Sequence, residues 1–83
     1  MDKVLVNVQV PATQEKYDIF IPKTLSIEEA IQLLVTSIEE LSSGKYVKSD
    51  KEILFYYEQD CIMKRAKKVS DYDLKNGDTL LVF

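Results

Sequence analysis

Histidine is absent from this sequence of 83 residues, and cysteine occurs once, at Cys61. Without histidine, neither the Ser–His and Cys–His pairs of nucleophilic catalysis nor the Cys/His zinc sites can form. One cysteine cannot form an internal disulfide, so we interpret Cys61 as a structural or idle thiol of an intracellular protein. Only Gly44 and Gly77 are glycines, which excludes a glycine-rich phosphate loop. We therefore expect no catalytic residue, no cofactor, no metal and no enzymatic activity.

The sequence also lacks long apolar runs and an excess of positive charge. No apolar run approaches the roughly 20 residues of a membrane span, and no signal-peptide pattern opens the chain. The net charge is −3, from 11 basic and 14 acidic residues, which argues against a general nucleic-acid binder. Two domains would each be too small to fold unaided, so residues 1–83 are expected to form one soluble domain.

Two segments near the N-terminus alternate between apolar and polar residues. In residues 3–10 the apolar positions are four valines spaced two apart, which predicts a half-buried strand. Residues 17–21 alternate in the same way, and prolines end both segments, at Pro11 and Pro22. The sequence therefore predicts a hairpin with its turn at residues 12–16.

A helical period follows. Apolar residues recur at helical spacing between Ile27 and Leu41, which predicts one amphipathic helix. Ser26 and Glu29 have the spacing of a capping box at its start. Gly44 suits a left-handed cap at its end.

The C-terminal half is expected to contain shorter elements. Residues 52–57 are apolar on both faces, which indicates a central strand, and residues 61–63 are expected to form a brief strand. Residues 69–74 are expected to form a turn of helix, Asn76-Gly77 a tight turn, and residues 79–83 the last strand. The order predicts an α+β fold in which one helix packs on a mixed sheet, with the first and last strands parallel.

Two segments of this half resemble ubiquitin. Val69-Ser70-Asp71-Tyr72-Asp73-Leu74 resembles ubiquitin's Leu-Ser-Asp-Tyr-Asn-Ile segment, and residues 79–82 resemble its last strand. Ile53-Leu54-Phe55 resembles its central Leu-Ile-Phe strand. The element order is similar over the whole chain. The resemblance implies a β-grasp (ubiquitin-like) fold, with four to five strands on one helix in the order β-β-α-β-(β)-helical turn-β.

The chain is most similar in length, and in its run Asn76-Gly77-Asp78-x-Leu80, to the bacterial YukD/EsaB-like proteins. These are small ubiquitin-like domains associated with type VII (ESX-like) secretion. The resemblance implies a cytoplasmic accessory or adaptor that contacts protein partners, including membrane-associated secretion components that would recruit it to the inner face of the membrane. The segment of residues 64–68, before the helical turn, departs from ubiquitin because it is longer and more basic than the corresponding segment there.

Conjugated modifiers and sulfur carriers of the β-grasp class use a flexible Gly-Gly carboxylate. This sequence ends in Leu81-Val82-Phe83, inside the last predicted strand. We therefore expect a protein that is neither conjugated nor thiolated. The alternatives left open are a modifier or sulfur carrier whose tail is missing, and a structural subunit that forms a homodimer through its sheet face or an edge strand.

Two surfaces are candidates for binding a partner. The alternation, together with the resemblance to ubiquitin, places an apolar patch on the open face of the sheet, a face that ubiquitin uses to bind partners. Its predicted members are Leu5, Phe20, Leu54, Tyr56, Leu81 and Phe83. The second candidate is a basic patch, suited to an acidic partner or anionic lipid headgroups. Its members are Lys64, Arg65, Lys67 and Lys68.

Overall fold

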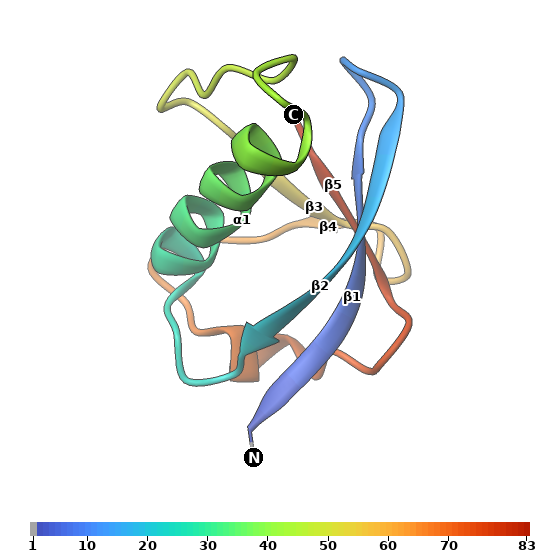
Figure 1. The fold of residues 1–83 in the computed structure, drawn as a ribbon. Helices are drawn as coiled ribbons and strands as arrows, with labels where there is room; N and C mark the ends of the chain where they lie inside the picture. Colours follow the sequence, from blue (N-terminus) through green and yellow to red (C-terminus); the bar gives the residue numbers. More distant parts are fainter. Residues whose placement is uncertain (1) are drawn as a thin grey trace.

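The computed structural model describes residues 2–83, which form one mixed sheet with a single α-helix on one face (Figure 1). The elements in chain order are β1 (Lys3–Val10), β2 (Glu15–Pro22), α1 (Ile27–Leu41), β3 (Leu54–Tyr56), β4 (Cys61–Ile62), the 3₁₀ helix η1 (Val69–Tyr72) and β5 (Thr79–Val82). The predicted order is confirmed, and β3 is shorter than the segment expected for it.

Within residues 2–83 the five strands lie in the order β2-β1-β5-β3-β4. β1 and β5 are parallel, with Val8 opposite Leu80, and all other neighbours are antiparallel. The turn before β5 is tied to β1 as well. Asn76 Oδ1 accepts from the Leu5 N–H at 2.9 Å, and the Gly77 N–H donates to the Leu5 carbonyl at 2.8 Å. Gly77 has φ +93°, a conformation that glycine adopts without steric cost.

The start of α1 is fixed by the predicted capping box. The Glu29 N–H donates to Ser26 Oγ at 3.1 Å, and the Ser26 N–H donates to Glu29 Oε1 at 2.9 Å. The bond from the Ser26 N–H to the carboxylate is the main cause that holds the pKa of Glu29 below its ordinary value. The helix ends at Leu41 with Ser42 as its C-cap, and Ser43 and the predicted Gly44 follow with positive φ, 55° and 88°.

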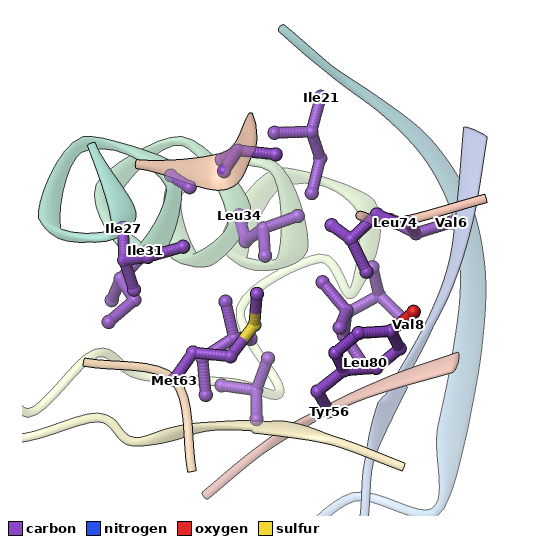
Figure 2. Packing of buried hydrophobic residues seen from close by; sticks show 14 of the residues in the cluster. Val6, Val8, Ile21, Ile27, Ile31, Leu34, Tyr56, Met63, Leu74 and Leu80 are labelled. Carbon is purple, nitrogen blue, oxygen red and sulfur yellow. The ribbon is translucent and has the colours of Figure 1, made fainter. Parts of the chain in front are cut away.

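The core lies between α1 and the sheet (Figure 2). All four valines of β1 are at most 1% exposed, because they alternate onto the face that the helix covers. The helix contributes the predicted stripe, Ile27, Ala30, Ile31, Leu34, Val35 and Ile38. Leu41 was expected to continue the stripe, but it lies 59% exposed at the last turn.

The predicted orientation of β3 is wrong. Leu54 and Tyr56 were expected on the open face, and they are 1% and 2% exposed in the core. The reason is the register with β5, in which Leu54 lies opposite Val82 and Tyr56 opposite Leu80, both buried. Opposite residues of neighbouring strands share a face, so β3 must turn these side chains toward the helix. Figure 2 shows the Tyr56 ring beside Leu80 and Val8.

Candidate protein-binding surface

The face of the sheet that turns away from α1 has no helix or strand packed on it among residues 2–83. A single cross-strand row shows which side chains it presents. The Cα partners of this row, from β2 to β4, are Lys16, Gln9, Leu81, Phe55 and Ile62. The row begins polar at β2 and becomes apolar from β5 onward.

Large apolar side chains gather on the β5-β3-β4 half of this face. Tyr57 is 62% exposed, Ile62 and Phe83 are 59% exposed, and Ile53 is 45% exposed. Ile53 and Phe83 form a backbone pair, because each N–H donates to the other's carbonyl, at 2.9 and 3.0 Å. Phe55 and Leu81 form the neighbouring cross-strand pair, and both are half-buried. We refer to six residues together as the apolar patch: Ile53, Phe55, Tyr57, Ile62, Leu81 and Phe83.

The β1–β2 half of the same face is polar in its middle. Asn7 Nδ2 donates to Asp18 Oδ1 at 3.3 Å, and Gln9 Nε2 donates to Asn7 Oδ1 at 2.9 Å. Leu5 and Phe20 lie opposite each other beyond these residues. They are therefore on the predicted face but separated from the apolar patch.

A shallow hollow of about 260 Å³ marks the border between the two halves. Its walls are Gln9, Tyr57, Thr79 and Leu81. Gln9 and Thr79 form its polar side, and Tyr57 and Leu81 form its apolar side. A hollow of this kind can receive one side chain of a partner, which gives the surface a directional feature besides its apolar character.

Of the six residues predicted for the patch, Leu81 and Phe83 lie in it. The four members that sequence reasoning missed are Ile53, Phe55, Tyr57 and Ile62. No signal in the sequence could have found them, because residues 52–57 are apolar on both faces and the side that is buried depends on the register of β3 with β5.

The members of the basic run differ in their contacts. The Arg65 guanidinium forms an ion pair with Glu28 of α1, and its Nη2 donates to the Glu52 carbonyl at 2.6 Å. Arg65 thus joins the helix start to the entry of β3. The Lys67 ammonium lies 5.8 Å from the centre of the Tyr72 ring, in cation–π geometry. Lys64 and Lys68 are exposed.

The entry to β3, which positions Ile53, is held by a buried carboxylate. Glu52 is 2% exposed, and its Oε2 accepts from the Tyr46 hydroxyl at 2.7 Å and from the Ser49 N–H at 2.6 Å. Burial acts to raise the pKa of Glu52, but these hydrogen bonds together outweigh it and lower the pKa. Burial and the nearby Glu52 carboxylate raise the pKa of Tyr46. Tyr46 and Ser49 in the loop before β3 are therefore both held by the Glu52 carboxylate.

Residues 2–83 contain no group of three or more Cys, Asp and Glu side chains arranged to hold a metal ion. None of the described helices is long and apolar enough to cross a membrane.

Solved structures with this fold are numerous, and three illustrate it. The chain is 15% identical to a ubiquitin-like domain of Arabidopsis thaliana (TM-score 0.69), covering 100% of this chain and 78% of that one. It is 13% identical to a designed protein based on ubiquitin (TM-score 0.71, 99% and 88%). It is 14% identical to ATBAG1, solved in complex with HSP70 (TM-score 0.71, 96% and 39%). No protein-family model and no curated protein matches the chain.

These similarities establish the fold as ubiquitin-like β-grasp, as the sequence predicted. At such low identities they carry no residue-level correspondence. The binding surface is therefore argued from this chain's own geometry.

Proposed function

We propose that this ubiquitin-like β-grasp domain is a non-catalytic module that binds a protein partner through the apolar patch. The observation that carries the proposal is the concentration of exposed apolar side chains on one half of the open face. Four of the six patch residues are 45–62% exposed, while the polar residues Asn7, Gln9 and Asp18 occupy the other half.

The composition of the patch supports a protein as the occupant. Burying apolar surface contributes about 25 cal/mol per Å², and tyrosine is enriched among residues that dominate binding energy. Two aromatic residues, Tyr57 and Phe83, project at its rim. Exposed apolar patches bordered by polar residues are typical of interaction sites. A partner that presents apolar side chains at its centre would complement this surface.

ATBAG1 is a protein of this fold class that was solved in complex with another protein, HSP70. This chain covers 39% of ATBAG1. The complex supports a protein, rather than a small molecule, as the class of ligand.

We further propose that the partner is a component of bacterial type VII secretion and that the domain acts as its cytoplasmic accessory. The support for this finer proposal is the resemblance of the Asn76-Gly77-Asp78-x-Leu80 run and of the chain length to the YukD/EsaB-like proteins.

Site-specific photo-crosslinking in the source cells tests both proposals. A crosslinking residue at Ile62 should give a defined protein adduct, and the same residue at Leu33 should not. Both positions are exposed aliphatic side chains, but Leu33 lies on α1, on the other side of the sheet. Ile62→Asp should abolish co-purification of the same protein. Equal adducts from both positions would contradict the patch, and an adduct unrelated to secretion would contradict only the finer proposal.

A further inference from the structure

The two edges of the sheet differ in length and protection. β4 has two residues, whereas β2 has eight and pairs only with β1. The other side of β2 has no neighbouring strand among residues 2–83. A long strand at an edge leaves unpaired N–H and C=O groups, which can accept a further strand.

The helix leaves most of β2 uncovered on its inner side. Each valine of β1 is at most 1% exposed, but Glu15, Tyr17 and Ile19 on the same face of β2 are only half-buried, and burial becomes complete at Ile21. The first five residues of β2 are therefore accessible along the edge and on the inner face.

Two polar atoms at this place lack a partner. Glu15 Oε1 and the Tyr17 hydroxyl are buried and accept or donate no hydrogen bond within residues 2–83. They belong to residues two apart, so they lie on the same side of β2. Burial and, after it, the neighbouring Glu15 carboxylate raise the pKa of Tyr17, so the two groups lie close together within the chain although they form no hydrogen bond of good geometry.

The outer side of β2 carries complementary charges. Lys16 and Asp18 are both exposed and flank Tyr17. An antiparallel pairing of two β2 strands centred on Tyr17 places Lys16 of each copy opposite Asp18 of the other. Centring on Lys16 or Asp18 would instead bring like charges together, and centring on Ile19 would leave Asp18 opposite Phe20. Only the register centred on Tyr17 pairs unlike charges directly across the junction.

We propose that β2 pairs with β2 of a second copy of this chain, antiparallel and centred on Tyr17, so that two five-stranded sheets become one continuous sheet. The two-fold axis makes the contact self-complementary. Residues diagonal to each other across antiparallel strands are within reach of aromatic side chains, so Tyr17 of each copy would lie near Glu15 of the other.

The pairing leaves the apolar patch free. β2 is separated from β3 by two strands, and the patch lies on the β5-β3-β4 half. One edge strand buries less surface than a standard interface of about 1,600 Å², so the dimer is expected to be weak and concentration-dependent. A dimer built in this way presents two copies of the patch.

Sedimentation equilibrium from about 10 µM to about 1 mM tests the proposal. Lys16→Asp and Asp18→Lys each place like charges opposite each other twice, so each should weaken dimerisation by about 10-fold or more. The double variant Lys16→Asp/Asp18→Lys restores the unlike pairs and should dimerise like the wild type. The single variants change net charge in opposite directions, so a loss common to both does not arise from net charge.

Ile62→Asp serves as the control at the apolar patch and should dimerise like the wild type. Circular dichroism confirms that each variant is folded. A wild type that stays monomeric throughout, a double variant that fails to regain dimerisation, or a dimer lost in Ile62→Asp would each overturn the proposal.

Discussion

The covered and open faces of the sheet can be compared within six consecutive residues, 52–57. Glu52, Leu54 and Tyr56 turn toward the helix and are at most 2% exposed, whereas Ile53 and Tyr57 turn away and are 45% and 62% exposed. Leucine and isoleucine are nearly the same size, and two tyrosines stand side by side. The face, and not the residue type, decides which side chain supports the fold and which is available to a partner.

The largest effect on stability is expected when an aspartate is introduced on the covered face and, in a separate variant, on the open face. Leu54→Asp buries a carboxylate without a partner, so the variant should lose at least about 4 kcal/mol of unfolding free energy. A loss of that size would unfold most molecules of a domain this small. Ile53→Asp should stay within about 1 kcal/mol of the wild type. Urea unfolding followed by circular dichroism measures both, and equal losses would contradict the assignment of the two faces.

A smaller difference is expected for the two tyrosines. The Tyr56 hydroxyl donates to the Asp78 carboxylate, which also accepts from the Lys75 N–H at 3.0 Å. Tyr56→Phe should therefore cost about 1–3 kcal/mol, the usual range for losing a hydrogen bond to a charged group. Tyr57→Phe, on the open face, should change stability by less than about 0.5 kcal/mol. A Tyr56→Phe variant as stable as Tyr57→Phe would show that the buried bond adds nothing.

The smallest effect concerns pH and the covered carboxylate Glu52. Because its folded-state pKa is lowered, its stabilising effect is present above its unfolded pKa, near 4.5, and is lost as pH falls through the folded pKa. Glu52→Gln should lower stability at pH 7 and flatten the decline in stability between about pH 5 and pH 3. Chemical unfolding at a series of pH values measures this. An unchanged slope in the variant would mean that other carboxyl groups cause the decline.

The elements with a clear one-sided pattern were predicted correctly. The sequence placed the valines of β1, the capping box of Ser26 and Glu29, and the apolar stripe of α1 correctly, except that Leu41 at the end of the stripe is exposed. In each case the apolar residues occupy one face only, or the signal joins residues three apart. Local physics is then sufficient to fix the structure.

The candidate site was predicted less well, because residues 52–57 are apolar on both faces. A period-two pattern fixes which residues lie together, but it does not fix the side on which a doubly apolar strand buries them. The assignment that placed Leu54 with Leu81 on the open face breaks the pairing rule, since Phe55 is the partner of Leu81. For the basic run, the sequence did not reveal that one member has a partner within the chain. Its Arg65 is engaged by Glu28, which is distant in sequence.

The sequence by itself determined that this chain forms a β-grasp domain, with the helix at residues 27–41 and parallel first and last strands, because one-sided apolar patterns and local caps carry that information. Only the tertiary structure decided the members of the apolar patch, the engagement of Arg65 and the uncovered edge of β2. These features depend on register and on contacts between residues far apart in sequence, and neither is encoded in the period of a single segment.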